Sequence, residues 1–324
     1  MLTFHTPDEV PAGFGPSAVT VGKFDGVHGG HRAVIEQLTA LAADRGLVPT
    51  VVTFDRNPLS LLRPELCPTP LVSNDQKLEL LAGAGVEATL MVRFDEAFRD
   101  LPAEQFVRQI LVDALHASVM LVGADFRFGA GGVGTVTLLR ELGEQFGFET
   151  VVIDDVAMDG DRRVSSTWVR ELLAEGRVEE AAGLLGALPG IRSMVVPGEQ
   201  RGRTLGYPTA NLSPEIEGYI PADGVYAAWL LVDGTRYPAA VSIGNNPTFE
   251  GVPDKQVEAH AIDARLDLYG ANVEVQFVKY IRGMRKFPGA DELAAQMRAD
   301  EQQIREVLGV APKQIGGSSV HDDA

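Results

Sequence analysis

Short apolar runs alternate with helix-like segments through the first half of this chain, and this alternation limits the possible folds more than any other feature. The runs are nearly continuous in apolar and β-branched residues, as in strands that are buried on both faces. Because parallel strands need crossover connections, usually helices, the pattern predicts an α/β domain with a doubly wound parallel sheet. The expected strands are 19–22, 47–54, 86–92, 118–123 and 148–153, and the expected helices are 32–45, 73–81, 102–115 and 135–146.

The pattern changes after about residue 185, where glycine and proline interrupt the chain. Turn signals such as Asp233-Gly234 then separate the apolar runs and favour antiparallel hairpins. Several strands with few helices predict a small β-barrel or sandwich. The expected strands are 193–196, 224–232, 237–243, 256–262 and 273–281, and a closing helix carries Leu293, Met297, Ile304 and Leu308 on one face.

These patterns predict two domains and a tail. The expected limits are 1–186 for the first domain, 187–310 for the second and 311–324 for a tail whose small polar residues indicate disorder. No internal repeat is recognisable in the chain.

Composition excludes several classes of protein. The formal net charge of −17 over 324 residues argues against broad binding to nucleic acid or to anionic membranes. No apolar run reaches the length of a membrane span, and the N-terminus lacks the basic and apolar regions of a signal peptide. The single cysteine, Cys67, excludes an intrachain disulfide and fits a reducing cytoplasm. We expect a cytoplasmic protein that binds neither nucleic acid nor membrane; the sequence carries no signal for an oligomeric state.

The first expected strand leads into a glycine-rich turn and two histidines at the start of a helix. The segment reads Gly22-Lys-Phe-Asp-Gly-Val-His-Gly-Gly-His31. A helix start offers unpaired N–H groups and a positive dipole end, which suit an anion. Residues three apart share a helix face, so His28 and His31 can reach one phosphate together. This is the HxGH pattern of a nucleotidylyl-transfer site. A plain loop or helix cap is the alternative, and the strand–turn–helix context favours the phosphate site.

Three further segments of the first domain carry groups suited to a phosphate or to a planar ligand. In 122–129, Phe126 and Phe128 either face a planar ligand or pack in the core. In 163–170, hydroxyl residues followed by an arginine form either a helix cap with phosphate contacts or a simple N-cap. The segment 53–58 is a strand end that leads into a polar turn.

The second half has a glycine- and arginine-rich run of its own at 198–212. Gly202 and Gly206 favour a flexible loop, and Arg203 is suited to phosphate. Thr209 and Asn211 offer the neutral oxygen ligands that Mg²⁺ accepts, although the same residues also make an ordinary turn. Further along, Glu258 lies in a strand-like run, where it is either a base or an exposed surface carboxylate.

Taken together, in this order and spacing, these segments resemble the bacterial bifunctional riboflavin kinase/FMN adenylyltransferase (FAD synthetase) family. The resemblance covers about residues 15–308 and is carried by 22–31, 123–129, 163–170, 208–211 and 257–260. It implies an N-terminal Rossmann-like nucleotidyltransferase domain with a doubly wound parallel sheet. It also implies a C-terminal antiparallel β-barrel riboflavin kinase domain with a terminal helix.

The resemblance implies two ATP-dependent reactions with Mg²⁺ as cofactor. Riboflavin is phosphorylated to FMN in the second domain, and FMN is adenylylated to FAD in the first with release of pyrophosphate. By this likeness, His28 and His31 stabilise charge during adenylylation, Glu258 is the base of the kinase step, and Thr209 and Asn211 bind Mg²⁺. The expected nucleotide and phosphate contacts are Gly22, Phe24, Asp25, Gly26, Ser165, Ser166, Thr167, Arg170, Gly202, Arg203 and Gly206. The expected flavin contacts are Asn57, Asp125, Phe126 and Phe128.

The chain departs from the usual pattern of the family at Lys23, at Asn57, where histidine is common, and at Trp168. None of these departures removes a core catalytic residue. Three alternatives stay open: a kinase whose first domain is degenerate, a nucleotidylyltransferase acting on a phosphopantetheine or a polyol phosphate, and a flavin-sensing or storage protein. The Thr-Ala-Asn loop argues against the second alternative, and ATP consumption distinguishes an enzyme from the third.

Overall fold

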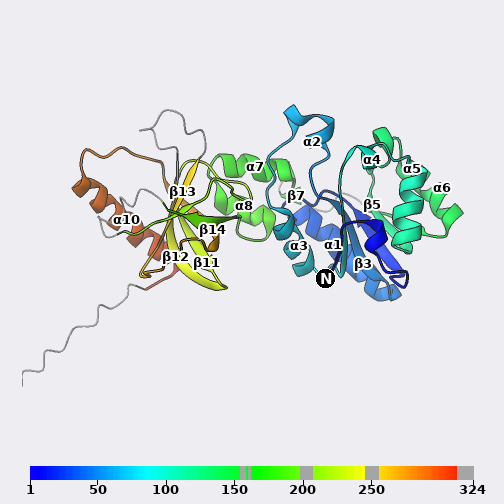
Figure 1. Ribbon diagram of the computed structural model, residues 1–324, viewed down its shortest axis with the longest axis horizontal. Coiled ribbons are helices and arrows are strands. Elements are labelled where there is room, and N and C mark those ends of the chain that lie inside the picture. Colours follow the sequence, from blue (N-terminus) through cyan, green and yellow to red (C-terminus); the bar gives the residue numbers. More distant parts are fainter. Residues whose placement is uncertain (154–157, 160–161, 198–206, 245–254, 312–324) are drawn as a thin grey trace, which may run out of the picture. The chain divides into compact units, whose positions relative to one another are not determined.

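The computed structural model describes residues 1–153, 158–159, 162–197, 207–244 and 255–311, and Figure 1 shows its helices and strands. The chain divides into two compact units, which are described separately. The first unit comprises Met1–Val169 with Leu184–Gly186, and the second comprises Arg170–Gly183 with Ala187–Ala324. The domain limit at 186/187 stays a prediction, and the predicted disordered segment lies outside the described residues from 312 onward.

The first unit contains a six-stranded sheet in which every neighbouring pair of strands is parallel. The strand order is β1-β4-β3-β2-β5-β6, so the direction of winding reverses between β2 and β5. In open α/β sheets, ligands bind beside such a reversal, at the carboxyl ends of the strands. The strands are β1 (Leu2–Phe4), β2 (Ser17–Val21), β3 (Val48–Phe54), β4 (Ala88–Val92), β5 (Ala117–Gly123) and β6 (Glu149–Ile153).

Helices cover both faces of this sheet, which confirms the predicted doubly wound fold. Because successive strand residues point to opposite faces, Ala18 and Val51 enter one apolar cluster while Val19 and Val52 enter another. The first cluster packs against α1 (Gly29–Arg45) and α3 (Asn74–Gly83). The second packs against α5 (Ala103–Phe106), the π-helix η3 (Val107–Ala114) and α6 (Val136–Phe146). In Figure 1, α1 and α3 lie on one side of the sheet and α5 and α6 on the other.

Local signals explain where several helices begin. The predicted capping box at α3 is confirmed: the Ser73 hydroxyl accepts from the Gln76 N–H, and the Gln76 side chain accepts from the Ser73 N–H. Helix α1 begins at Gly29 rather than at residue 32, so His28 is its N-cap. The single helix predicted over 102–115 is instead an α-helical turn that continues as η3. The shorter segments are α2 (Leu59–Leu62), α4 (Glu96–Arg99) and the pair β7 (Met158–Asp159) and β8 (Arg162–Arg163).

The second unit is built on a closed antiparallel barrel with the strand order β10-β13-β12-β11-β14-β9. Of the two architectures predicted from the sequence, a barrel or a sandwich, the structure is thus the barrel. Asp233 and Gly234, with φ of 46° and 77°, form the two-residue turn that Asp-Gly predicts between β11 and β12. The strands are β9 (Gly190–Val196), β10 (Ala210–Leu212), β11 (Gly224–Val232), β12 (Thr235–Gly244), β13 (Gln256–Ala261) and β14 (Asn272–Arg282).

Of the helices that the structure describes, three belong wholly or in part to the second unit. They are α7 (Ser166–Ala174), α8 (Val178–Leu185) and α10 (Ala290–Leu308). Two of the four residues of the expected apolar face of α10 are confirmed, because Ile304 is fully buried against Ala227 and Ile262 of the barrel and Leu308 packs against the same cluster. Among the described residues, no helix combines the length and the apolar character that a membrane-crossing segment requires.

Candidate active sites

The turn after β2 has an unusual backbone. Phe24 and Val27 adopt φ of 48° and 42°, a left-handed conformation that is unfavourable for bulky and β-branched residues. Gly26, between them, has a φ of 80°, and a Cβ there would lie 2.8 Å from the Leu71 side chain. Such conformations persist where the surroundings impose them, and they cluster at ligand sites. The surrounding structure therefore imposes this backbone conformation on the turn.

Two side-chain hydrogen bonds hold this turn. The Asp25 carboxylate accepts a 2.8 Å hydrogen bond from the Leu71 N–H. The Ser166 hydroxyl donates a 2.9 Å hydrogen bond to the Asp25 carbonyl. The neighbouring Ser165 caps α7, since its hydroxyl accepts from the Trp168 N–H. The predicted helix cap is thus present at Ser165, while Ser166 joins the segment to the turn, and phosphate contacts of both residues stay a prediction.

His28 and His31 lie together at the start of α1. Their rings are stacked with centroids 3.8 Å apart, and the Phe24 ring lies 5.0 Å from His31. His28 is 6% exposed and caps α1 without a side-chain hydrogen bond to its first turn. The Nδ1 atom of His31 is buried and has no hydrogen-bond partner among the described residues. A ligand oxygen is a natural partner for such an atom, because buried polar groups are rarely left unpaired.

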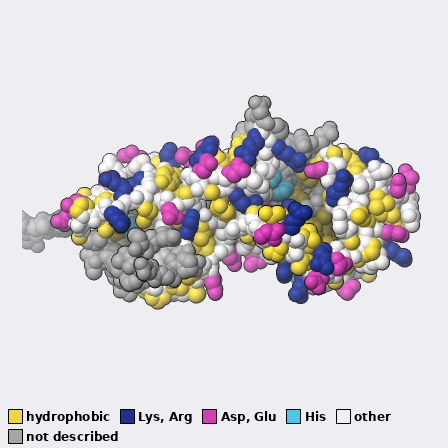
Figure 2. Space-filling model, turned by 90° about the horizontal axis from the view of Figure 1, so that it is seen from above, with side chains coloured by type: hydrophobic (Ala, Val, Ile, Leu, Met, Phe, Trp, Pro, Cys, Tyr) yellow, Lys and Arg dark blue, Asp and Glu magenta, His cyan; other side chains and the backbone are white. Residues whose placement is uncertain are grey.

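The electrostatic environment of His31 favours an anion. The pKa of His31 lies well below the ordinary value of 6.5, chiefly because of burial, with further contributions from His28, Lys23, Arg163 and Lys77. The ring is therefore neutral at pH 7 and surrounded by cationic groups. The net charge of −17 does not prevent this local field, and Figure 2 shows basic and acidic side chains intermixed over the visible face. A phosphate arriving here would meet positive potential and unpaired helix N–H groups.

An aromatic cavity of about 540 Å³ lies where the strand winding reverses, at the carboxyl ends of β2, β3 and β5. Gly22 and Lys23, in the turn after β2, line it. Six phenylalanines form a connected series along it, with successive ring centroids 5.5 to 6.1 Å apart. In order of contact they are Phe54, Phe94, Phe98, Phe106, Phe128 and Phe126. A cavity of this kind suits a flat apolar ring system.

The four residues expected to contact flavin all line the aromatic cavity. Phe128 is 6% exposed and belongs to the core, which confirms core packing for this residue. Phe126 stacks on it and is partly exposed, and its contact with a planar ligand stays a prediction. The Asn57 side chain accepts from the Leu59 N–H in the turn after β3. Asp125 is largely exposed, with one carboxylate oxygen 4.0 Å from the Arg163 guanidinium.

Among the six phenylalanines of the ring series, three were not singled out from the sequence: Phe94, Phe98 and Phe106. Phe94 could have been found, because it follows the end of β4 by two residues and so lies at the ligand-binding edge of the sheet. Phe98 lies in the short helix α4 and Phe106 at the end of α5, and no local pattern marks either as a cavity residue.

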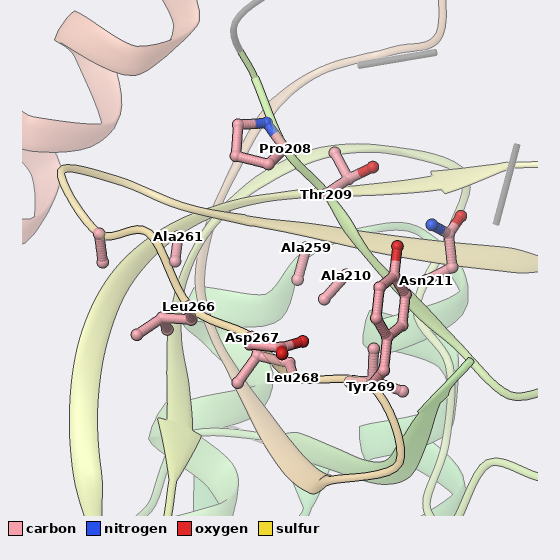
Figure 3. A pocket seen from close by; sticks show the side chains of 12 residues that line it. Pro208, Thr209, Ala210, Asn211, Ala259, Ala261, Leu266, Asp267, Leu268 and Tyr269 are labelled. Carbon is pink, nitrogen blue, oxygen red and sulfur yellow. The ribbon is translucent and has the colours of Figure 1, made fainter. Parts of the chain in front are cut away.

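In the second unit, a cavity of about 330 Å³ lies beside β10 and β13 (Figure 3). It is lined by Thr209, Ala210 and Asn211, by Ala259 and Ala261, and by the loop 266–269. Asp267 and Tyr269 of this loop were not singled out from the sequence, although both carry oxygens at the cavity. Figure 3 shows the side chains of Thr209 and Asn211 directed away from that of Ala210.

The strand register places Glu258 beside the Thr-Ala-Asn segment. Asn211 is directly opposite Glu258 in the antiparallel pair of β10 and β13, which puts both side chains on the same face. Ala259, on the other face of β13, is buried, whereas Glu258 is partly exposed. His260, two residues on, lies 2.8 Å through Nδ1 from the Pro208 carbonyl and so fixes the residue before Thr209.

The remaining predicted contacts are less defined. Thr167 is exposed in the first turn of α7, and Arg170 is partly buried in the same helix. Gly202, Arg203 and Gly206 lie outside the described residues. Within the described part of the chain, no three His, Cys, Asp or Glu side chains form a group that could hold a metal ion.

Comparisons with known proteins cover both units. The FAD synthetase family profile matches residues 12–168, and the riboflavin kinase profile matches residues 185–308. An Escherichia coli K12 protein named bifunctional riboflavin kinase/FMN adenylyltransferase is 40% identical over 90% of this chain and 93% of its own length. A Bacillus subtilis protein of the same name is 34% identical over 89% of this chain and 91% of its own length. A crystal structure from Streptococcus pneumoniae, described as a macrolide-efflux protein, has a TM-score of 0.82 and 32% identity. The match covers 94% of this chain and 99% of that one.

Proposed function

The chain belongs to the bifunctional riboflavin kinase/FMN adenylyltransferase family, and on this premise we propose that its two reactions take place at the two sites described above. The enzyme phosphorylates riboflavin to FMN and adenylylates FMN to FAD, using ATP. We assign adenylylation to the histidine pair and aromatic cavity of the first unit, and phosphorylation to the Thr209–Asn211 and Glu258 region of the second. A cytoplasmic location is our inference from the lone Cys67.

In the first unit, one observation carries the proposal: the turn that leads to the histidine pair also lines the aromatic cavity, where the strand winding reverses. Gly22 and Lys23 line the aromatic cavity, and the same turn leads directly to His28 at the start of α1. The isoalloxazine ring of FMN would occupy the aromatic cavity beside Phe126, and the triphosphate of ATP would lie at the start of α1. This arrangement brings the FMN phosphate toward the α-phosphorus of ATP.

The adenylyl step then needs positioning and charge stabilisation rather than a protein nucleophile. An FMN phosphate oxygen forms a bond to the α-phosphorus, and the bond from that phosphorus to the oxygen shared with the β-phosphate breaks to release pyrophosphate. His28 and His31 donate hydrogen bonds to the oxygens that gain charge. Because His31 is neutral before ligands bind, phosphate binding is expected to raise its pKa and to favour uptake of a proton.

In the second unit, Glu258 orients the riboflavin 5′-hydroxyl and accepts its proton as that oxygen bonds to the γ-phosphorus of ATP, with ADP leaving. Thr209 and Asn211 bind the phosphates from the neighbouring strand. Phosphoryl transfer depends mainly on positioning and charge stabilisation. One carboxylate held on a rigid pair of strands is therefore a sufficient contribution from the protein. The pairing of Asn211 with Glu258 supports this assignment.

The donor set of this region fits Mg²⁺. Asn211 and Glu258 supply an amide oxygen and a carboxylate on one face of two paired strands, and Thr209, directly before β10, supplies a hydroxyl. Mg²⁺ prefers hard oxygen ligands and is usually held by few protein groups together with substrate phosphates and water. Thr209 and Asn211 would hold the ion, and the bound ion would neutralise negative charge on the phosphates.

Two substitutions test the assignment of the two sites. His28→Ala should lower the rate of FAD formation from FMN about 100-fold, because it removes a charge-stabilising donor, and should leave FMN formation from riboflavin unchanged. Glu258→Gln should lower the rate of FMN formation from riboflavin and should leave FAD formation unchanged when FMN is supplied. Separated flavins and released pyrophosphate and ADP provide the measurement. If either substitution slowed both reactions equally, the two-site assignment would be wrong.

A further inference from the structure

The first unit buries a lysine at its ligand-binding edge to which the proposed mechanism assigns no contact with a substrate. Lys77 lies in α3 and is 7% exposed. Lysine is rarely buried, because removing an ammonium group from water is costly. Burial lowers the pKa of Lys77, and the carboxylates of Asp25 and Asp55 act in the opposite direction. The fold therefore keeps a costly charge close to the turns that follow β2 and β3.

The ammonium group of Lys77 is joined to the end of β3. Nζ donates a 2.8 Å hydrogen bond to the Phe54 carbonyl and a 3.3 Å hydrogen bond to Asn74 Oδ1. The Asn74 amide in turn donates a 2.8 Å hydrogen bond to the Asp55 carbonyl. Two successive backbone carbonyls at the end of β3 are thus held by the first turns of α3.

The same region is joined to the end of β4. The Asp55 carboxylate accepts a 2.9 Å hydrogen bond from the Phe94 N–H, which follows β4. The rings of Phe54 and Phe94 lie 5.5 Å apart and both line the aromatic cavity. The contacts of Lys77 and Asn74 with 54–55 therefore set the position of one wall of that cavity.

We propose that Lys77 is a positioning residue for FMN, which acts by fixing the Phe54 carbonyl and through it the wall formed by Phe54 and Phe94. The inference rests on the proposed function, in that the aromatic cavity is taken as the flavin site. Without the ammonium group, the Phe54 carbonyl loses a charged hydrogen-bond donor in a buried setting. The end of β3 can then move, and the rings that contact the flavin move with it.

A purely structural role must be separated from this one, and Leu81 offers a matched control. Leu81 lies in the same helix and is fully buried. It packs in the apolar cluster of α1 and α3, not in the cluster against which Phe54 packs. Leu81→Ala should lower the unfolding temperature of the unit without altering the hydrogen bonds at 54–55. Any effect that follows from lower stability alone should therefore occur in this variant too.

The experiment measures kcat and KM for FMN during FAD formation, below the unfolding temperature of every variant. Lys77→Met should raise KM for FMN about tenfold, with a smaller change in kcat and an unchanged rate of riboflavin phosphorylation. Lys77→Arg should recover part of the affinity, and Leu81→Ala should retain the wild-type KM. Asn74→Ala, which removes the second contact, should also raise KM and serves if Lys77→Met does not fold.

Two results would overturn the inference: a wild-type KM for FMN in both Lys77→Met and Asn74→Ala, or an equal rise of KM in Leu81→Ala. Phe126→Ala distinguishes this failure from a failure of the proposed function. If Phe126→Ala raises KM for FMN while the Lys77 and Asn74 variants do not, the cavity assignment stands and only the role of Lys77 is wrong. If none of the three affects KM for FMN, the cavity is not the flavin site.

Discussion

At the scale of single residues, the first site combines a neutral His31 with nearby cations. His28 and His31 are three residues apart in sequence, and the structure stacks their rings at the start of α1. The spacing indicates that they share a helix face, but it does not indicate the neutral state of His31. That state follows from burial and from Lys23, Arg163 and Lys77, which come from separate segments of the chain.

The lowered pKa of His31 predicts a pH dependence of stability. Its pKa in the folded protein lies below the unfolded value of about 6.5, so between the two values the unfolded chain binds more protons. The first unit should therefore lose stability as the pH falls from 7.5 to 5.5. His31→Asn should reduce this loss. Hydrogen exchange of the β2 and β3 amides measures it, and an equal pH dependence in both proteins would contradict the prediction.

At the scale of elements, periodicity and turn chemistry predicted the longer strands and helices. The Ser73–Gln76 capping box and the Asp233-Gly234 turn are confirmed because each rests on a local rule. The strands β1 and β10 were not predicted, since three residues are too few to show a periodicity. Their pairing is set by distant partners, β4 for the first and β9 and β13 for the second.

The sequence likewise predicts only part of the two candidate sites, because distant segments of the chain complete them. The sequence predicts the histidine pair, Phe126 and Asn211 because strand ends and motif spacing mark them. The aromatic cavity, by contrast, is assembled from the ends of β3 and β4 and from α4 and α5. Only the three-dimensional packing shows that Phe98 and Phe106 complete the ring series.

The packing of α10 on the barrel gives a prediction at this scale. Ile304 is fully buried against Ala227 and Ile262, so Ile304→Ala should destabilise the second unit by about 2–5 kcal/mol. Gln303→Ala, at an exposed position of the same helix, should change stability by less than about 0.5 kcal/mol. Hydrogen exchange of the β11 and β12 amides provides the measurement. Similar values for the two variants would show that α10 is not anchored through Ile304.

At the scale of the whole molecule, each unit carries its own cavity and its own reactive groups. The first unit holds the histidine pair and the aromatic cavity, and the second holds Glu258 beside Asn211. The two family profiles match separate parts of the chain, 12–168 and 185–308. Each of the three alternatives left open by the sequence predicts a different outcome. A kinase with a degenerate first domain forms FMN alone, and a nucleotidylyltransferase with another substrate forms an adenylylated non-flavin product. A flavin-sensing or storage protein binds flavin without turnover.

The most direct test follows the flavins formed by the wild-type protein. Purified protein is incubated with riboflavin, ATP and Mg²⁺, and riboflavin, FMN and FAD are separated over time while ADP and pyrophosphate are quantified. The account predicts that FMN forms first with one equivalent of ADP and is then converted to FAD with one equivalent of pyrophosphate. Formation of FMN that is never converted to FAD, or flavin binding without consumption of ATP, would contradict it.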